Sequence, residues 1–417
     1  MIARVEALNY RCLRYVAQEV DAFQVLVGPN ASGKSTFLDT VNLVGDLLRE
    51  GVEGAAARSP DIRDLVWMRQ GDRFEIALEF NIPPEQQSRL RENAFRRARY
   101  EVAIGMSADA AKELRILGEN LWLTPETKPQ PREALLFPSS PRPPLTLLHG
   151  EGKHAPPDWR KVVTKKADSG NDYFMAETTR WNNPFRLGPH KLALANLPED
   201  EERFPVAIWV KRCLMEGVKR LMLNSEAMRR PVRPGLPLDF QPDGSNLPRI
   251  VERLAKDPER FQDWIGHLQT ALPDLRRIDT VERPEDLHKY VRIEYSTGLL
   301  APSWVISDGT LRLLAVTLLA YLRGKQQTYL IEEPENGIHP LAVETVFQSL
   351  SSSYDAQILC ATHSPVVLSR AEPRQLLCFA KTEDGATDIR RGDEHPTLSN
   401  WQRDADLGTL FAAGVLG

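Results

Sequence analysis

Hydrophobic positions in the first 80 residues of the chain follow two spacings, one typical of strands and one typical of a helix. Apolar runs and an alternating pattern predict strands at Ile2–Leu8, Phe23–Val27 and 74–80, and a helical pattern covers Thr36–Leu48. Polar breaks after this point indicate an antiparallel arrangement. The strands predicted there are Tyr100–Met106 and Leu114–Leu123.

The middle of the chain lacks a clear sheet pattern. Residues 125–157 are rich in proline, which suits neither a central strand nor a helix, so this stretch is predicted to be an extended excursion on the surface. Helical patterns follow at Pro205–Leu223 and Leu247–Leu272. The sequence has no internal repeat and no sustained heptads, so a long coiled-coil arm is not expected.

In the last third, short apolar runs alternate again with helical patterns. The predicted strands are Tyr329–Ile331, Gln357–Cys360 and Leu376–Phe379, and the predicted helices are Leu341–Leu350 and Pro365–Ser369. This order predicts the α/β fold class with a buried, mostly parallel sheet.

Strand and helix patterns alternate both near the start of the chain and in its last third, which predicts a core built from two separate segments. Residues 1–84 and 291–380 are expected to form this core, and residues 85–290 to be inserted as an antiparallel β subdomain and a helical lobe. Residues 381–417 are expected to form a C-terminal tail with a helix at Asp406–Leu416.

Composition narrows the class of protein. The 417 residues carry a net charge of −4, so a contact with nucleic acid has to come from a local basic patch. The four cysteines lie far apart without a CxxC spacing, which argues against a zinc site or a disulfide framework. No signal peptide opens the sequence, and the longest apolar stretch, Leu313–Leu322, is shorter than the about 20 residues that span a bilayer. These features predict a cytoplasmic protein without membrane contact.

Residues 28–36 read Gly-Pro-Asn-Ala-Ser-Gly-Lys-Ser-Thr and match the phosphate-binding loop GxxxxGK[ST], placed between a strand and a helix. The glycines let backbone N–H groups turn toward phosphate oxygens, and the helix directs its positive N-terminus at the same anion. Lys34 is expected to reach the β- and γ-phosphates, and Ser35 to hold Mg²⁺. The nucleotide-binding residues predicted here are Gly28, Asn30, Gly33, Lys34, Ser35 and Thr36. The loop predicts a protein that binds ATP with Mg²⁺.

Two carboxylates follow directly after the predicted strand Tyr329–Ile331. A carboxylate at a strand tip can hold Mg²⁺, and the next can polarise an attacking water. Position assigns the first role, metal binding, to Glu332, and the second, catalytic role to Glu333. The simpler interpretation is a charged loop end, which the abrupt change from apolar strand to Glu-Glu-Pro makes less attractive.

Two further short motifs add candidate residues. Residues 361–365, Ala-Thr-His-Ser-Pro, end the next predicted strand, and His363 there is a candidate contact to the γ-phosphate with a catalytic role. Residues 305–312 contain Ser307 and Gly309 at the start of a helical pattern, where a hydroxyl and N–H groups can meet an anion. Taken alone, this second motif is an N-capped helix start.

The four motifs together resemble an ABC-type ATPase of the soluble branch that includes the SMC, RecF-like and OLD (overcoming lysogenization defect) proteins. The Walker A, signature, Walker B and switch-histidine motifs correspond to Gly28–Thr36, Ser307–Leu311, Tyr329–Glu333 and His363. The resemblance covers about half of the chain. It implies a P-loop NTPase fold with an ABC-type head and ATP hydrolysis.

The sequence departs from the family pattern at three places. The first Walker B acid is usually Asp and is Glu332 here, which weakens the division of roles between Glu332 and Glu333. The signature reads Ser-Asp-Gly-Thr where transporters have Ser-Gly-Gly-Gln, which is more similar to OLD-like ATPases. The Q-loop glutamine has no clear counterpart, and Gln70 is the nearest candidate.

The resemblance also implies a homodimer. In this family the signature serine of one subunit completes the ATP site of the other, so Ser307 and Gly309 are expected to act across a two-fold axis. ATP then tightens the dimer, and hydrolysis at Glu333 releases it.

OLD proteins carry a Toprim nuclease after the ATPase core, whereas about 50 residues follow His363 here and hold no cluster of acids. The chain therefore resembles the nuclease-less ATPases of prokaryotic antiphage systems, such as the Septu ATPase and retron-associated ATPases. That analogy implies a separate effector protein, expected to be a nuclease.

Three other functions stay open on the sequence. A RecF- or SMC-like ATPase of DNA repair or chromosome maintenance would bind DNA directly. Basic stretches that suit this function lie in the expected insertion, although each also reads as a solvated face: Arg89, Arg91, Arg96, Arg97 and Arg99; Lys161, Lys165 and Lys166; Arg229, Arg230 and Arg233. A scaffold that binds ATP without hydrolysis and a transporter subunit are less consistent with the motifs. A nuclease or toxin gene next to this one would favour the defence role.

Overall fold

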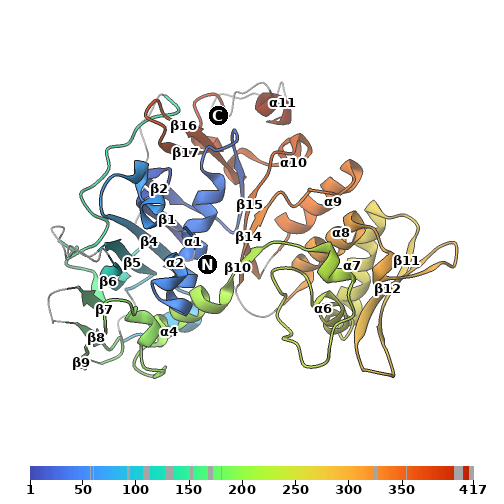
Figure 1. Cartoon of the computed structure of the whole chain (residues 1–417), viewed down its shortest axis with the longest axis horizontal. Helices are drawn as coiled ribbons and strands as arrows, with labels where there is room; N and C mark the ends of the chain where they lie inside the picture. Colours follow the sequence, from blue (N-terminus) through green and yellow to red (C-terminus); the bar gives the residue numbers. More distant parts are fainter. Residues whose placement is uncertain are drawn as a thin grey trace.

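The computed structural model of the protein describes residues 1–56, 58–59, 61–91, 94–106, 113–126, 136–150, 154–167, 172–179, 181–323, 327–353, 355–398 and 407–412. Three parts follow one another along the long axis of the molecule (Figure 1). A large antiparallel sheet lies at one end, a mostly parallel sheet in the middle, and a helical lobe with a small sheet at the other end.

The central sheet has six strands in the order β10-β14-β15-β3-β16-β17, and only the pair β16–β17 is antiparallel. Its strands are β3 (Phe23–Val27), β10 (Val218–Leu221), β14 (Gln327–Glu332), β15 (Ala356–Ala361), β16 (Leu376–Lys381) and β17 (Thr387–Arg391). Every residue of β15 is buried, as expected for an inner strand that is covered on both faces. The predicted α/β class with a mostly parallel core sheet is confirmed.

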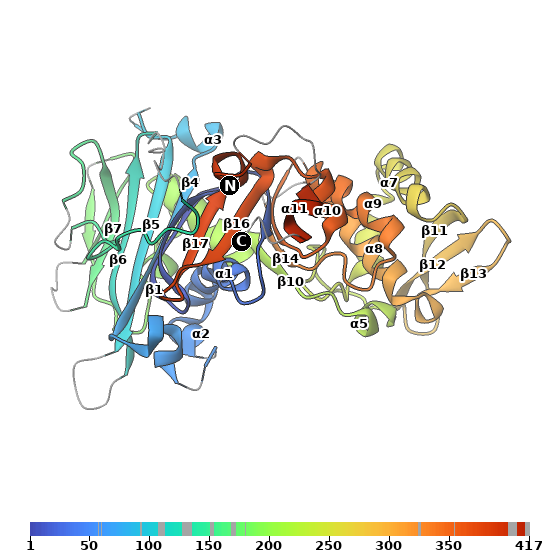
Figure 2. The same ribbon diagram turned by 90° about the horizontal axis from the view of Figure 1, so that it is seen from above.

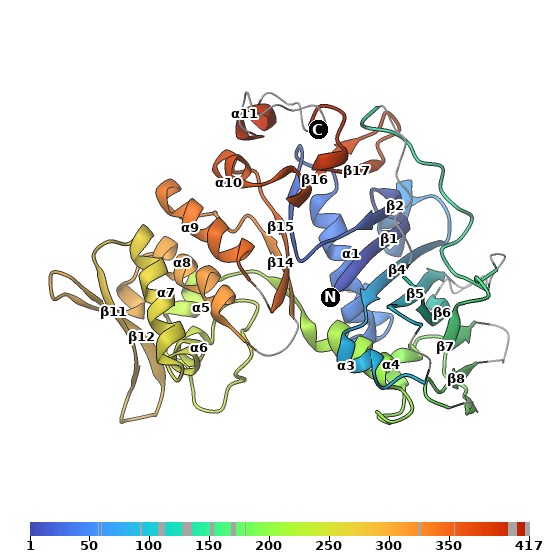
Figure 3. The same cartoon turned by 180° about the vertical axis from the view of Figure 1, so that it is seen from behind.

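Helix α1 (Lys34–Glu50) lies between the central sheet and the large antiparallel sheet (Figure 3). Its apolar side chains are buried on both sides of the helix, among them Phe37, Leu38 and Val44. Phe37 meets Phe379 of β16 edge to face, with 5.6 Å between the ring centroids. The helix that follows the phosphate-binding loop is therefore fixed by both sheets.

The large sheet has eight antiparallel strands in the order β2-β1-β4-β5-β6-β7-β8-β9. These strands are β1 (Ile2–Tyr10), β2 (Leu13–Glu19), β4 (Arg73–Asn81), β5 (Arg97–Met106), β6 (Leu114–Thr124), β7 (Arg160–Lys166), β8 (Tyr173–Met175) and β9 (Asn182–Pro184). Short helices α2 (Glu53–Ala56) and α3 (Pro84–Gln87) lie at its margins. Because side chains alternate along a strand, one face packs on α1 and the other carries charged residues.

The structure describes residues 136–150 in the centre of the proline-rich stretch. These residues run across the charged face of the large sheet (Figure 2). Thr146 donates its hydroxyl to Glu75 at 2.8 Å, and the backbone N–H of His149 donates to Glu101 at 2.9 Å. Arg99 is buried on the same face and pairs with Glu101 at 2.7 Å. The predicted surface excursion thus covers a sheet face and buries its charges in ion pairs.

The helical lobe packs on the face of the central sheet opposite α1 (Figures 1 and 2). It contains α5 (Ser225–Arg229), α6 (Leu247–Leu254), α7 (Pro258–Ala271), α8 (Asp308–Leu318), α9 (Pro340–Ser351) and the antiparallel strands β11 (Leu275–Glu282), β12 (Lys289–Tyr295) and β13 (Leu300–Pro302). Helices α10 (Pro365–Arg370) and α11 (Leu407–Ala412) lie next to each other beyond β15. The rest of the helix predicted at 406–416 falls outside the described residues.

The structure places the boundaries between these parts differently from the sequence prediction. Strands β5 to β9 extend the sheet of β1 and β4, so the border predicted at residue 84 falls between two neighbouring strands of one sheet. Residues 291–295 belong to β12 in the small sheet and not to the central sheet. Strand β17 joins the central sheet, although its residues were assigned to the tail. Each difference arises because strand pairing joins segments whose local patterns do not reveal their partners.

The long helix predicted at Pro205–Leu223 is also interrupted. Helix α4 (Pro205–Arg212) passes through a π turn into β10, which pairs in parallel with β14. The helix predicted at Leu247–Leu272 is divided into α6 and α7 because Asp257 caps α7 by accepting from the N–H of Arg260.

Candidate functional site

The carboxyl ends of β3, β14 and β15 surround a cavity of about 420 Å³. Each motif predicted from the sequence, except the signature, contributes to its wall. The residues that line it are Arg11, Cys12, Asn30, Ala31, Ser32, Gly33, Lys34, Ser35, Thr36, Glu332, Glu333, Ala361 and His363. Parallel strands bring these distant segments together because their carboxyl ends meet at one edge of the sheet.

The loop between β3 and α1 needs glycine at two positions. Gly28 has φ 146° and Gly33 has φ 106°, both outside the range that most residues adopt. A Cβ atom on Gly28 would lie 2.2 Å from the carbonyl oxygen of Phe379, and one on Gly33 would lie 2.3 Å from Oγ1 of Thr387. The loop is therefore shaped by its own dihedral angles and by close packing on β16 and β17.

Helix α1 begins at this loop without a side-chain cap on Gly33. Its first N–H groups lack partners within the helix, so they are available to an anion at the cavity. Nζ of Lys34 donates to the carbonyl oxygens of Gly28 and Pro29 at 2.8 and 2.9 Å. Burial lowers the pKa of Lys34 to about 8, against the opposing effect of the carboxylates of Glu333 and Glu332. A phosphate placed here would meet N–H donors and a cation together.

Glu332 is held between two side chains at the tip of β14. Its Oε2 accepts a hydrogen bond from the hydroxyl of Ser35, and its Oε1 accepts one from Arg220 of β10 at 2.7 Å. The two oxygens of Ser35 and Glu332 thus lie side by side at the cavity, and both are ligand types that Mg²⁺ prefers. Among the described residues no group of three or more His, Cys, Asp or Glu could hold a metal ion. The hydroxyl of Ser35 and the carboxylate of Glu332 could supply two oxygen ligands to Mg²⁺, and water and phosphate oxygens would have to supply the others.

Glu333 differs from Glu332 in its backbone and in its contacts. It has φ 48°, a sparsely populated conformation for this residue type, and its N–H donates to the carbonyl oxygen of Ala361 at 2.8 Å. Its carboxylate is exposed at the cavity, and within the described residues it makes no hydrogen bond or ion pair. Such a group is free to orient a water molecule.

His363 lies in the turn after β15. Burial and the positive charge of Lys34 lower the pKa of His363, and the charges of Glu333 and Glu335 oppose this shift, so the imidazole is neutral at pH 7. Thr362 fixes the turn, because its hydroxyl donates to Glu335 and accepts from the N–H of Ser364 at 2.9 Å. The sequence analysis did not single out Thr362 or Glu335.

Ser307 and Gly309 lie outside the cavity. Ser307 is exposed and caps α8, and its Oγ accepts from the N–H of Thr310 at 3.3 Å. A Cβ on Gly309 would lie 2.5 Å from the carbonyl oxygen of Gly337, so this glycine allows α8 to approach the loop after β14. Gln70 is exposed and does not line the cavity either.

The structure adds residues that the sequence analysis missed. Arg11 and Cys12, in the turn between β1 and β2, line the cavity. Arg220 contacts Glu332 across 112 positions of sequence, and Asp39 of α1 binds the hydroxyl of Tyr10 at 2.5 Å. No local motif marks any of these residues, because their contacts depend on the way the sheets meet.

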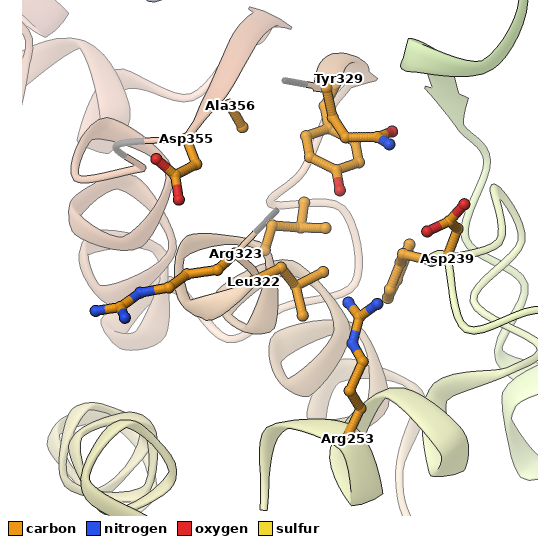
Figure 4. Close-up of a pocket in the computed structure, with 10 residues that line it drawn as sticks. Asp239, Arg253, Leu322, Arg323, Tyr329, Asp355 and Ala356 are labelled. Atoms are coloured by element: carbon orange, nitrogen blue, oxygen red, sulfur yellow. The ribbon is translucent and has the colours of Figure 1, made fainter. Parts of the chain in front are cut away.

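A much smaller hollow of about 30 Å³ lies at the other end of β14, beside Tyr329, Arg253 and Asp239 (Figure 4). It has room for about one water molecule and not for a nucleotide.

In the part of the chain that the structure describes, no helix has the length and apolar character that would let it cross a membrane.

A glycine-rich loop between a strand and a helix, with acidic residues at the tip of a neighbouring strand of a mostly parallel sheet, defines a P-loop nucleotide-binding protein. Nucleotide binding is the property that this class shares. The chain belongs to the family described as "AAA domain, putative AbiEii toxin, Type IV TA system", whose sequence model matches residues 23–369.

Solved SMC head domains resemble the structure. An Smc head "bound to the C-winged helix domain of ScpA" aligns with a TM-score of 0.53 and 14% identity over 93% of this chain and 96% of that chain. An Smc head with an extended coiled coil, bound to the C-terminal domain of ScpA from Pyrococcus furiosus, gives 0.49 and 12% over 93% and 95%. The SMC head from Thermotoga maritima gives 0.42 and 11% over 94% and 98%. The first of these similarities confirms a fold like that of an SMC head. A search of curated proteins gives no significant sequence match.

Proposed function

We propose that the protein is a Mg²⁺-dependent ATPase that dimerises head to tail on ATP and controls a separate effector protein. The observation that carries the proposal is that Lys34, Ser35, Glu332, Glu333 and His363 line one cavity. Family membership supports nucleotide binding, and hydrolysis is the further step proposed here.

The roles of these residues follow from their contacts. Lys34 and the first N–H groups of α1 would bind the phosphates, and Ser35 and Glu332 would hold Mg²⁺, which would neutralise charge on the triphosphate. Glu333 accepts the proton of the water that attacks the γ-phosphorus, since its carboxylate is not engaged by other described residues. The bond between the γ-phosphorus and the oxygen that bridges it to the β-phosphate breaks, and ADP leaves with that oxygen. The imidazole of His363 binds an oxygen of the γ-phosphate.

The position of Ser307 supports the dimer. It is exposed on the surface, and it does not line the cavity of its own subunit. A second copy, related by a two-fold axis, can present its Ser307 and the start of its α8 to the open cavity.

The family description supports a role in a toxin–antitoxin or defence system. One structurally similar head is named with a domain of ScpA bound to it, which supports a separate protein as the partner of this fold. We expect the effector to be a nuclease whose activity depends on the ATPase.

Co-expression with the product of the neighbouring gene tests this role. The partner is expected to copurify, and its activity should be lost with Lys34→Ala or Glu333→Gln, while the purified chain alone should show no nuclease activity with Mg²⁺ or Mn²⁺. The alternative is a DNA-binding ATPase of RecF or SMC type. It predicts ATP-dependent binding of duplex DNA by the chain alone, with steep weakening by salt and no copurifying partner. That result would replace the effector role.

A further inference from the structure

One segment, residues 218–229, connects the metal side of the cavity with the start of helix α8. It consists of β10, a short turn and α5, and we refer to it as the bridging segment. Figure 2 shows β10 beside β14, and α5 packs against α8. A hollow of about 610 Å³ lies between the segment, the tip of β14 and the first turns of α8.

At its first end the bridging segment holds Glu332. Arg220 pairs with Leu330 of β14 in the strand register, which places its side chain near the tip of that strand. Its guanidinium donates to Oε1 of Glu332 at 2.7 Å and lies 3.9 Å from Oδ1 of Asp39 on α1. Because Arg220 donates to Oε1, the orientation of the carboxylate is fixed with Oε2 toward the hydroxyl of Ser35.

At its second end the bridging segment holds the residues on both sides of Ser307. The guanidinium of Arg229 donates to the carbonyl oxygen of Ile306 at 3.1 Å and to the carboxylate of Asp308. The backbone carbonyl of Arg229 also accepts from the hydroxyl of Ser303 at 2.8 Å. An unpaired Asp308 would repel a triphosphate that approaches Ser307, and Arg229 neutralises this charge.

The middle of the segment is tied to the same helix. Arg312 of α8 donates to the carbonyl oxygens of Leu223 and Asn336, each at 3.4 Å. Asn224 caps α5 by accepting from the N–H groups of Glu226 and Ala227 at 3.0 and 3.2 Å. The two arginines are therefore joined by a short, hydrogen-bonded connection.

We infer that Arg220 and Arg229 are positioning residues for two different nucleotide sites of the dimer. Arg220 orients Glu332 in the site of its own subunit, and Arg229 orients Ser307 for the site of the partner. This inference rests on the composite dimer proposed above. The two arginines lie nine positions apart, yet they serve opposite sites.

Mixing experiments separate the two roles. In a dimer of Arg229→Met and Lys34→Ala subunits, one site combines an intact loop and Glu332 with an intact Ser307 turn. Such a mixture should regain about a quarter of the wild-type rate, because half of randomly formed dimers are mixed and each has one intact site of two. A mixture of Arg220→Met with Lys34→Ala should stay inactive, because both defects then affect loop-side residues and no intact site forms.

The reference mixture combines Ser307→Ala with Lys34→Ala, because alanine removes the hydroxyl without blocking the approach of the second subunit. Activity in this mixture but not in the Arg229→Met mixture would overturn the role of Arg229 and leave the composite site intact. Activity in the Arg220→Met mixture would overturn the role of Arg220. If the reference mixture stays inactive, the composite site itself is wrong, and the inference is rejected with it.

A binding measurement tests Arg220 without turnover. In a Glu333→Gln background, Arg220→Met should raise the Mg²⁺ concentration that supports half-maximal ATP binding by about tenfold, as loss of a residue that orients a metal ligand does. Arg220→Lys should restore part of this loss because it keeps the charge. An unchanged Mg²⁺ requirement would contradict the assignment.

Matched controls exclude general damage. Lys219→Met removes a cation from the opposite face of β10, and Arg230→Met removes an exposed cation next to Arg229. Both should keep wild-type rates and wild-type Mg²⁺ requirements. Thermal unfolding shows whether each variant is folded, and methionine retains the apolar stem of arginine in every case.

Discussion

Two helices of the protein begin where the sequence suggests a contact with phosphate, and they begin in different ways. Helix α1 starts after Gly33 without a side-chain cap, and its first turn has no acidic residue. Helix α8 starts after Ser307, whose side chain caps it, and Asp308 lies in its first turn. The first helix start is open to an anion, whereas the second is satisfied within its own chain.

The difference suggests separate roles for the two helix starts: nucleotide binding for α1, and completion of the ATP site of the partner subunit for α8. The end of α1 lies with Lys34, Glu332 and Glu333 at one cavity, so in the proposed function one subunit is expected to bind the nucleotide. The end of α8 carries an acid that is neutralised by Arg229, and it lies apart from that cavity. In the proposed dimer, it would contribute after the nucleotide is bound. Changes at α1 should therefore remove binding, and changes at α8 should remove later steps.

The largest effect is expected from Lys34→Ala. Loss of a charged donor should weaken ATP binding by about a hundredfold, or about 3 kcal/mol. Isothermal titration calorimetry with ATP and Mg²⁺ measures this, and Lys219→Met serves as the control for loss of a positive charge elsewhere. Retained affinity in Lys34→Ala would contradict the assignment of α1 as the binding end.

Glu333→Gln should leave ATP binding intact and slow hydrolysis by about a thousandfold, since it removes the proposed general base. The trapped ATP should then hold the dimer together, which size-exclusion chromatography detects. Equal turnover by Glu333→Gln and wild type would show that another group activates the water.

Ser307→Arg sharpens the comparison from the α8 side. The large cation should block the approach of a second subunit, so ATP binding stays near that of wild type while dimer formation and hydrolysis are lost. Calorimetry and chromatography of Ser307→Arg in the Glu333→Gln background measure the two properties. A strict monomer of the single variant Glu333→Gln with ATP would refute the composite site.

The pH dependence of ATP binding tests the role of Lys34 at the start of α1. Burial lowers the pKa of Lys34 to about 8, and a bound triphosphate would raise this pKa again. Binding then takes up a proton above this pH, so ATP affinity should be constant around neutral pH and fall by at most about tenfold per unit above pH 8. Calorimetry from about pH 7 to about pH 9.5 checks the sign. An affinity that does not fall above pH 8 would contradict it.

The smallest expected effect is on stability. Ser307→Ala removes the cap of α8 and should lower the free energy of unfolding by about 1 kcal/mol. Chemical denaturation of the nucleotide-free protein measures this change. An unchanged stability would indicate that solvent satisfies the end of α8 as well as Ser307 does.

Much of this arrangement was predictable from local patterns. The strand Phe23–Val27, the loop after it and the helix that follows lie where the sequence predicted them, because a buried run, two glycines and a helical pattern each leave a local signal. The predicted residues Lys34, Glu332 and His363 line one cavity because each lies at or just after the carboxyl end of a strand of the parallel sheet. The variants above test the roles proposed for these residues.

The remaining features depend on contacts between distant segments. Strand β10 has four residues and follows a helix, so its pairing with β14 was hidden in a helical pattern. Glu75 and Glu101 read as the solvent side of an amphipathic sheet, yet residues 146–149 bury them. Arg220 could not be assigned, since nothing near it in the sequence identifies Glu332 as its partner.

The burial of α1 between two sheets has a mechanical consequence. A helix packed on both sides cannot slide or tilt alone, because close-packed interiors resist small displacements. Any push that a bound nucleotide exerts on the start of α1 is therefore shared with the eight-stranded sheet and the central sheet. Because α1 packs on the large sheet, a displacement of the start of α1 would also displace this sheet. A partner protein bound to the large sheet, far from the nucleotide, would therefore respond when the nucleotide binds and when it dissociates.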